Sequence, residues 1–288
     1  MSDQYRSGPK PYLQGPMPSG REPIFNLPAV IVALIGVMVV IHLGRLLLSD
    51  QADLDVLSAF AVVPARFALD FGWTDQTQIV RELMAGLDRT TAAQRLAVAR
   101  FFVDGGGPRW WSVLTYALLH AGTVHIAMNC LWLAVFGSPL ARRFGAFRFL
   151  LVVAVGSVAG AAAHVFLHSS DVVPLVGASA GVSAATGAAA RFVFSRGLRI
   201  GAMADDAAVR ALPALSLPDM LRNRQALVFV VFWFATNWLF GSGLVDVAGE
   251  GQSIAWEAHI GGFLAGLLLL PLMDRPGSAT ETSFPDVN

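Results

Sequence analysis

Two serines stand in a run built almost entirely of glycine and alanine, the stretch VGASAGVSAATGAAA from Val176 to Ala190. Serine has the shortest reach of the oxygen nucleophiles, and a histidine base must come within about 2.6–3.2 Å of its hydroxyl. Glycine and alanine leave room for such an approach. The stretch therefore predicts a helix at the centre of a bundle, with Ser179 and Ser183 as candidate nucleophiles.

His259 is the candidate base, because its neighbours in WEAHIGGFLAG are also small. Gly262 and Gly266 follow it at helical spacing, and this small-xxx-small pattern lets a second helix approach backbone to backbone. The pattern indicates either a Ser179–His259 dyad or a packing motif whose histidine only makes a hydrogen bond. Glu257 precedes His259 by two positions and therefore points to a different helix face, so a dyad is favoured over a triad.

Hydrogen-bond donors accompany these two groups. His125 and Asn129 in HAGTVHIAMN are four residues apart and share one helix face, and their simplest role is to tie neighbouring helices together. Ser179 follows a predicted loop, Val173–Gly177, so we expect it at a helix N-terminus. Unpaired backbone N–H groups there favour developing negative charge. A hydroxyl, an imidazole and such donors are the groups that acyl transfer requires.

The composition places these residues in a membrane. Of the 288 residues, 55% are hydrophobic and 14% are charged, whereas soluble domains carry about a quarter charged residues. The formal net charge of zero gives no reason to expect a nucleic-acid partner. Cys130 is the only cysteine, which excludes an intrachain disulfide and a multi-cysteine metal site, and we expect neither a metal nor a cofactor.

The apolar runs predict an all-α polytopic membrane protein with six transmembrane helices, because about 20 apolar residues span the hydrocarbon core. The predicted spans are Pro28–Leu48, Val113–Gly137, Phe149–His168, Ala178–Ser195, Ala226–Gly243 and Glu257–Met273. They form a membrane domain of residues 28–273, flanked by a flexible N-terminal tail, 1–27, and a C-terminal tail, 274–288. Residues 49–110 are an insert in which AQRLAVARFFVDGGG predicts an amphipathic helix in the membrane interface.

Arginines in the loops predict the orientation, because positive charge is retained on the cytoplasmic side of a membrane. They follow the second and fourth spans, at Arg142, Arg143, Arg148, Arg196, Arg199, Arg210, Arg222 and Arg224. The loops after the third and fifth spans contain no basic residue, and their charged residues are Asp171, Asp246 and Glu250. We therefore expect both termini in the cytoplasm and the insert outside. Abundant alanine and a single lysine suggest a GC-rich bacterial genome, and hence an integral protein of the inner membrane.

Three motifs resemble, in the same order along the chain, those of the rhomboid intramembrane serine proteases. HAGTVHIAMN is similar to the family's second-span histidine and asparagine, GASAGVSAATGA to its fourth-span G-x-S-x motif, and AHIGGFLAG to its sixth-span histidine with spaced glycines. The resemblance covers residues 110–273. It implies a six-transmembrane-helix rhomboid-like bundle in which Gly262 and Gly266 pack the sixth span against the fourth.

The resemblance also implies a reaction and its residues. The protein would hydrolyse peptide bonds in or near transmembrane segments of single-pass or polytopic membrane-protein substrates, within the lipid bilayer and through an acyl-enzyme. Ser179 would be the nucleophile, and His259 the general base and then the general acid. His125 and Asn129 would stabilise the oxyanion together with the backbone N–H of Ser179.

Ser183 departs from the family pattern. It stands where the family often has an aromatic residue that packs on the catalytic histidine. The sequence therefore does not show which residue would hold the His259 ring in place. Ser183 lies one helical turn deeper than Ser179, from which it could hydrogen-bond to either catalytic residue. The sequence GVSA also fits G-x-S-x, so Ser183 stays an alternative nucleophile.

Two other classes of protein stay open. A catalytically inactive rhomboid-like protein would bind membrane clients without cutting them, although such a relative would normally lack one of the reacting groups. A small transporter would use the histidines as a polar path, although the sequence shows none of the internal repeats common in transporters. Arg109 in RWWS departs from the family's usual Trp-Arg and receives no role, His120 is expected to be structural, and His164 and His168 are expected at the interface.

Overall fold

The computed structural model describes residues 27–86, 88–104, 106–195, 209–242 and 254–274. Within these ranges the regular structure is helical, apart from one isolated antiparallel bridge between Val62 and Leu175. The all-α prediction is confirmed for this part of the chain. The two predicted tails fall almost wholly outside it, as do four of the loop residues used to predict the orientation, Arg196, Arg199, Asp246 and Glu250.

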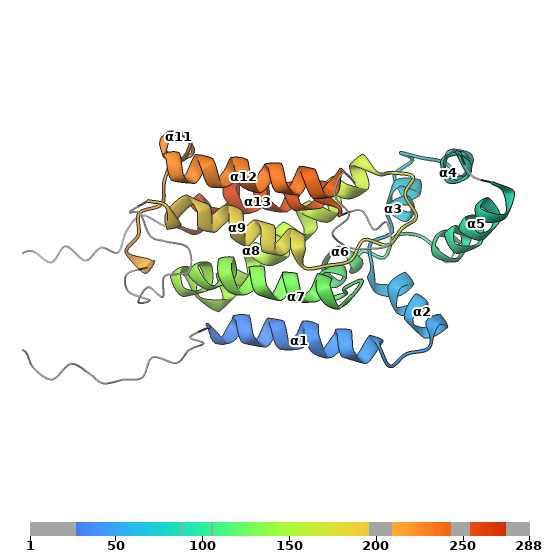
Figure 1. Cartoon of the computed structure of the whole chain (residues 1–288), viewed down its shortest axis with the longest axis horizontal. Helices are drawn as coiled ribbons and strands as arrows, with labels where there is room; N and C mark the ends of the chain where they lie inside the picture. The colour runs from blue at the N-terminus through green and yellow to red at the C-terminus, as the bar shows by residue number, and fades with distance from the viewer. Residues whose placement is uncertain (1–26, 87, 105, 196–208, 243–253, 275–288) are drawn as a thin grey trace, which may run out of the picture.

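A bundle of long helices runs along the longest axis of the molecule (Figure 1). Its members are α1 (Ala29–Arg45), α7 (Thr123–Trp132), α8 (Ser138–Leu167), α9 (Ser179–Val193), α12 (Arg224–Gly241) and α13 (Trp256–Met273). A π-helical turn, η2 (Leu133–Gly137), joins α7 to α8, and the short α11 (Leu217–Arg222) precedes α12. These helices lie close to the predicted spans, most of whose ends differ by no more than a few residues.

The predicted second span, Val113–Gly137, is wrong at its N-terminal end. The chain there forms α6 (Ser112–Thr115) and the 3₁₀ turn η1 (Tyr116–Leu118), and the continuous helix begins only at Thr123. Gly122 has extended backbone angles and interrupts the helix. A second interruption divides α8, because Gly145 has a φ of 80°, in the left-handed region that favours glycine. The predicted third span is the part of α8 that follows this kink.

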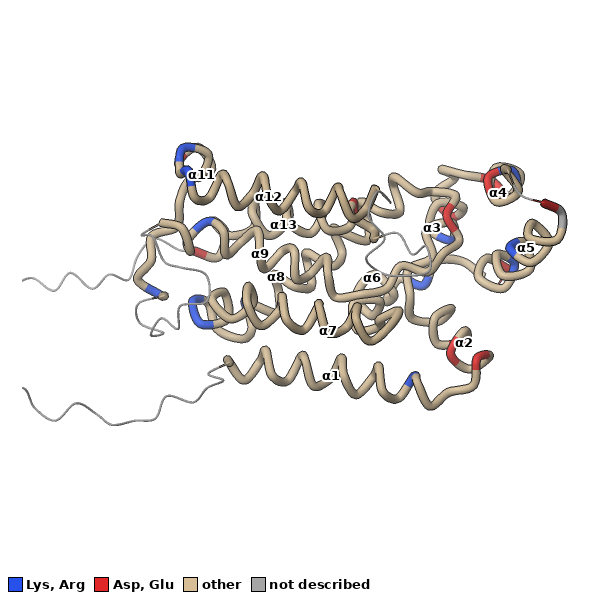
Figure 2. The backbone as a smooth tube through the Cα atoms, in the orientation of Figure 1, with Lys and Arg blue, Asp and Glu red and all other residues tan. Residues whose placement is uncertain are grey.

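Among the described residues, two helical stretches are long and apolar enough to cross a membrane, namely Thr123–Leu167, which comprises α7, η2 and α8, and α13. The apolar α1 is shorter. The number of crossings therefore stays a prediction. Charged residues gather at the two ends of the bundle and over the insert, and the middle of the long helices carries few of them (Figure 2).

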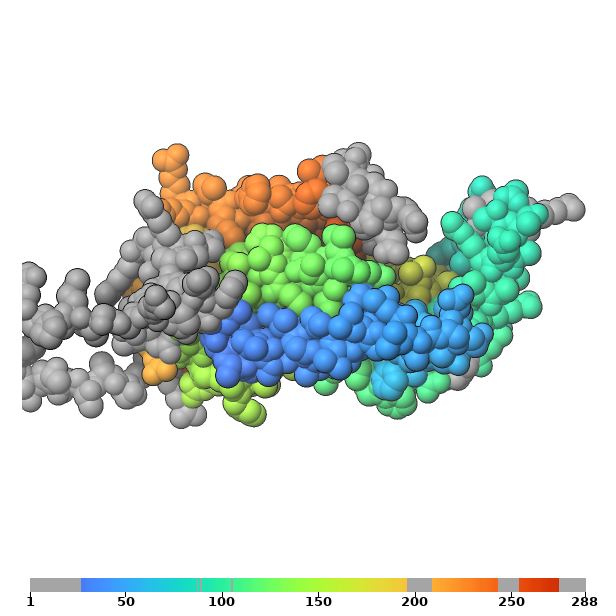
Figure 3. All heavy atoms as spheres, turned by 60° about the horizontal axis from the view of Figure 1, so that its bottom comes forward, coloured from blue at the N-terminus to red at the C-terminus, as the bar shows by residue number. Residues whose placement is uncertain are grey.

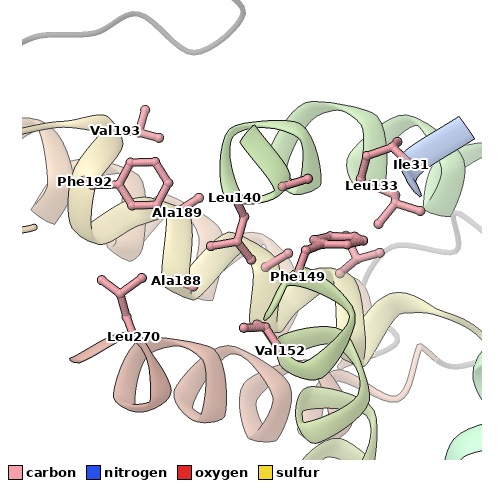
Figure 4. Packing of buried hydrophobic residues seen from close by; sticks show 14 of the residues in the cluster. Ile31, Leu133, Leu140, Phe149, Val152, Ala188, Ala189, Phe192, Val193 and Leu270 are labelled. Atoms are coloured by element: carbon pink, nitrogen blue, oxygen red, sulfur yellow. The ribbon is translucent and has the colours of Figure 1, made fainter. Parts of the chain in front are cut away.

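Helix α9 lies at the centre of the bundle, between α8 and α13. Every residue of α9 after Ser179 is buried, as the small-residue stretch predicts. Near its C-terminal end, Phe192 and the neighbouring alanines pack with Leu270 of α13 and with Leu140 and Val152 of α8 (Figure 4).

Glycines let α8 and α13 approach α9 from two sides. On α13, Gly262 and Gly266 lie against the backbone of Ala180 and Ala184, so closely that a Cβ atom at either glycine would overlap the facing carbonyl oxygen. On α8, Gly156 likewise faces the side chain of Ala184. Since no larger residue would fit, these contacts fix the separation of the helices that carry Ser179 and His259.

The insert forms a small helical unit at one end of the bundle. It contains α2 (Asp50–Phe60), α3 (Pro64–Asp70), α4 (Gln76–Met84) and α5 (Arg89–Val103), the last covering most of the predicted amphipathic helix. Figure 3 shows α4 and α5 projecting beyond this end, with α1 and α7 side by side on the face of the bundle. Arg66 joins the unit internally, since its buried guanidinium donates to carbonyls of Ser58 and Phe102.

The close packing predicts that Gly266→Ala lowers the melting temperature of the detergent-solubilised protein, because the new methyl would meet the Ala184 carbonyl. Overpacking of this kind costs about 1–3 kcal/mol. Gly36→Ala is the matched control, since nothing lies near that position in α1. Alanine there should leave the melting temperature unchanged or slightly raised, because alanine is the better helix former. Equal melting temperatures for the two variants would contradict the packing.

Candidate active site

Ser179 and His259 are in direct contact. Ser179 is the first residue of α9, and its Oγ lies 2.7 Å from Nε2 of His259, which is in the first turn of α13. The position of Ser179 agrees with the predicted helix N-terminus. Backbone N–H groups of the first helical turn have no partner within the helix and carry partial positive charge, so they can stabilise an anion formed beside Ser179.

Asn237 of α12 holds the other side of the His259 ring. Its Oδ1 lies 2.6 Å from Nδ1 of His259, and its Nδ2 donates to the carbonyl of Trp233 at 2.7 Å. The second bond fixes the orientation of the amide, so Oδ1 faces the imidazole and accepts a hydrogen bond from Nδ1. Nε2 is then the nitrogen with the lone pair, and it accepts a hydrogen bond from the Ser179 hydroxyl.

Asn237 was not among the predicted site residues. It lies beside Thr236 in the otherwise apolar stretch FWFATNWLF, and polar residues at membrane depth are costly and usually functional. That signal was available in the sequence. Sequence alone could not show that α12 places this particular residue behind His259.

His125 of α7 lies beside the loop that precedes Ser179. The backbone N–H of Ala121 donates to its Nδ1 over a long 3.4 Å, which leaves Nε2 as the protonated nitrogen. That nitrogen faces Gly177, where an added Cβ atom would lie 2.7 Å from it. Gly177 also has a φ of 121°, so both its backbone conformation and the space around it favour glycine. His125 therefore presents a donor beside Gly177, two residues before Ser179.

Asn129 is buried one turn further along α7. Its Nδ2 donates to the carbonyl of His125 at 3.0 Å, which leaves its second N–H for another acceptor. In the part of the chain that the structure describes, no hydrogen bond joins Asn129 to Ser179 or His259. The structure thus brings His125 next to the loop that precedes Ser179, whereas Asn129 bonds to the backbone of His125.

The loop before Ser179 is held by the segment that precedes α7. Gly177 donates its backbone N–H to the carbonyl of Tyr116 at 3.0 Å, and the Tyr116 hydroxyl donates to the carbonyl of Ser157 in α8 at 2.8 Å. Leu175 makes the bridge to Val62 of the insert. These bonds fix where α9 begins, and so where Ser179 is placed.

A second anchor lies before α7. Arg45 makes a bidentate ion pair with Asp53 at 2.7 and 2.9 Å and also donates to the carbonyl of His120 at 2.8 Å. His120 is buried, and its ring lies edge-on to that of His125, with the ring centroids 5.2 Å apart. Arg45 therefore connects α1 and the insert to the segment that leads to His125.

Two alternatives from the sequence are less well placed. Ser183 is buried one turn along α9, and among the described residues it makes no hydrogen bond to Ser179 or His259. No aromatic ring stacks on His259 in this part of the chain, so Asn237 is its support. The Glu257 carboxylate bonds to His168 at 2.9 Å rather than to His259, in agreement with its position on a different helix face.

Comparison with known proteins supports the resemblance. The rhomboid domain family matches residues 107–275, more than half of the chain. RHOMBOID-like protein 9, chloroplastic, of Arabidopsis thaliana is 37% identical over 79 residues, which are 27% of this chain and 18% of that protein. Rhomboid protease GluP of Bacillus subtilis (strain 168) is also 37% identical over 79 residues, 27% of this chain and 15% of that protein.

A longer match is Rhomboid protease GlpG of Pectobacterium atrosepticum, 25% identical over 169 residues, 59% of this chain and 50% of that protein. The chain thus matches no more than half the length of these three relatives. Rhomboid proteins are integral membrane proteins, and the family includes proteases. On the extent of the domain match, this chain belongs to the rhomboid family.

Proposed function

We propose that the protein is an intramembrane serine endopeptidase that cuts membrane-protein substrates in or near their transmembrane segments. One observation carries the proposal, the 2.7 Å contact between Ser179 Oγ and His259 Nε2, with Asn237 on the opposite ring nitrogen. A hydroxyl, an adjacent base and a group that orients the base are the recurring parts of nucleophilic acyl transfer. Family membership adds weight to it.

In the proposed acylation step, Ser179 Oγ attacks the carbonyl carbon of the scissile peptide bond, and the hydroxyl proton passes to Nε2 of His259. The resulting tetrahedral intermediate carries its negative charge on the former carbonyl oxygen. It collapses when the C–N bond breaks and His259 returns the proton to the leaving amine. Water then hydrolyses the serine ester by the same sequence, with His259 again acting first as base and then as acid.

The oxyanion needs donors aimed at the place where its charge develops. The proposal assigns this role to the backbone N–H of Ser179, at the start of α9, and to the Nε2–H of His125, beside Gly177. Asn129 would contribute its second N–H after a shift of its side chain, because its first is bonded to the His125 carbonyl.

The substrate class follows from the position of the site in the bundle. Peptide carbonyls in a transmembrane helix are already hydrogen-bonded, so a segment must unwind locally before Ser179 can reach one. Segments with small or helix-destabilising residues would unwind most easily. We infer no nucleic-acid partner and no cofactor for this reaction.

We further propose an orientation with both termini in the cytoplasm and the 49–110 insert outside, in a bacterial inner membrane. The arginines of the loops support it, and the insert lies at the same end of the bundle as Ser179 (Figure 1). A reporter protein that is active only in the cytoplasm should be active when it is fused to either terminus. A reporter that is active only in the periplasm should be inactive there, and its activity would contradict the proposed orientation.

A fluorophosphonate probe should label the detergent-solubilised protein covalently, because the contact with His259 activates the Ser179 hydroxyl. In Ser179→Ala the labelling rate should fall by about 10³-fold or more, to background. Ser183→Ala is the matched control, one turn along the same helix, and should label like the wild type. Gel fluorescence and mapping of the labelled peptide give the result.

The other outcomes separate the remaining hypotheses. Labelling that survives in Ser179→Ala but disappears in Ser183→Ala would move the nucleophile to Ser183. Folded wild-type protein that takes no label would favour an inactive rhomboid-like protein that binds membrane clients. Either result would overturn the proposed role of Ser179.

Asn237 is proposed as a positioning residue that acts through His259. Asn237→Ala should lower kcat for a model transmembrane substrate by about tenfold to a hundredfold, with little change in KM, because the ring loses its orienting acceptor. Asn237→Asp keeps an acceptor oxygen for Nδ1 and should restore most of kcat. The measurement is steady-state cleavage in proteoliposomes.

Thr236→Ala provides the control for the Asn237 variants. Among the described residues the Thr236 hydroxyl bonds only to carbonyls of its own helix, so its loss should leave kcat unchanged. If Asn237→Ala, Asn237→Asp and Thr236→Ala all behave alike, Asn237 has no positioning role.

A further inference from the structure

A second cluster of polar side chains lies near the active site without belonging to it. His164 and His168 are four residues apart at the C-terminal end of α8, and Glu257 is in the first turn of α13. The Glu257 carboxylate lies 2.9 Å from Nε2 of His168 and 3.9 Å from Nδ1 of His164. One ligand atom from each of the three residues can be chosen so that all lie within 4.8 Å of one another.

One nitrogen of this cluster lacks a partner among the described residues. Nδ1 of His164 is buried and makes no hydrogen bond to any of them, and the His164 side chain is only 9% exposed. An unsatisfied polar atom at such a position destabilises the folded state. Nδ1 lies on the side of the ring that faces the Glu257 carboxylate, so a group placed between the two would satisfy it.

We propose that His164, His168 and Glu257 bind a divalent transition-metal ion of the Zn²⁺ class. Two imidazoles and one carboxylate are a known ligand set for zinc, which keeps its fourth position for water. Zinc–ligand bonds of about 2.0–2.2 Å in a tetrahedron place ligand atoms about 3.3–3.6 Å apart. At present Nε2 of His168 lies 2.9 Å from Oε1 of Glu257, and Nδ1 of His164 lies 3.9 Å from Oε2. Rotation of the carboxylate and the two rings would bring one oxygen to the same distance from both nitrogens.

The ligand chemistry sets the class of ion. Mg²⁺ and Ca²⁺ prefer sets made of oxygen alone, whereas imidazole nitrogen suits zinc and its neighbours. An ion can enter from the side of His168, whose side chain is 39% exposed, while Glu257 is 11% exposed. We expected no metal from the sequence, but its single cysteine excludes only a multi-cysteine metal site.

The site would join two helices of the active-site region. Its ligands connect the end of α8 to the first turn of α13, and Glu257 is two residues before His259. A bound ion would therefore restrain the segment that carries the proposed base. Metal binding itself needs neither Ser179 nor His259, so it stands or falls separately from the proposed proteolysis.

Co²⁺ titration of the full chain in detergent tests the site, with the protein purified without a histidine tag. One Co²⁺ per chain should give the strong visible absorption of a four-coordinate ion, and added Zn²⁺ should displace it. Zn²⁺ should also raise the melting temperature, because a ligand that binds only the folded state stabilises it. These readouts do not depend on enzyme activity.

Variants identify the ligands. His164→Ala, His168→Ala and Glu257→Gln should each weaken binding by about tenfold or more. His42→Ala removes another buried histidine, and Ser179→Ala removes the proposed nucleophile; both should keep one site of wild-type affinity. Absorption that is absent from the wild type would leave only a hydrogen bond between His168 and Glu257, and absorption that survives in all three ligand variants would place the ion elsewhere. Either result would overturn the proposal.

Discussion

The close approach of α13 to α9 is the constraint on which the other features depend. Gly262 and Gly266 lie against the backbone at Ala180 and Ala184, where no side chain would fit. This separation puts the first residue of α9 within hydrogen-bond distance of His259. Serine has a short side chain, so a helix displaced by the width of one methyl group would break the contact. The same small residues therefore determine both the separation of α9 and α13 and the contact between Ser179 and His259.

Around this contact, several elements each fix one polar group. Helix α12 supplies Asn237, which sets the protonated nitrogen of His259. The segment before α7 holds the loop at Gly177 and presents His125 to it. In a bundle core of low dielectric, such bonds are strong and a missing partner is costly. This explains why the polar residues of the site come with partners already in place.

Much of the architecture could be predicted from the sequence, because apolar runs and small-residue patterns act locally. The glycine–alanine stretch predicted the central helix with Ser179 at its start, and the spacing of Gly262 and Gly266 predicted a tight helix contact. The break at Gly122 and the partner of His259 were missed. Both depend on which distant segments meet, Tyr116 with Gly177 and Asn237 with His259, and one sequence without its fold does not contain that information.

Cleavage of a single-pass substrate in proteoliposomes by His259→Ala tests the central contact most directly. The substrate would carry small residues and a helix-breaking proline in its membrane segment. The account predicts that the wild type cuts within or next to that segment, and that the folded variant does not cut it, because Ser179 has lost its base. Cleavage at the wild-type rate by His259→Ala would contradict the account.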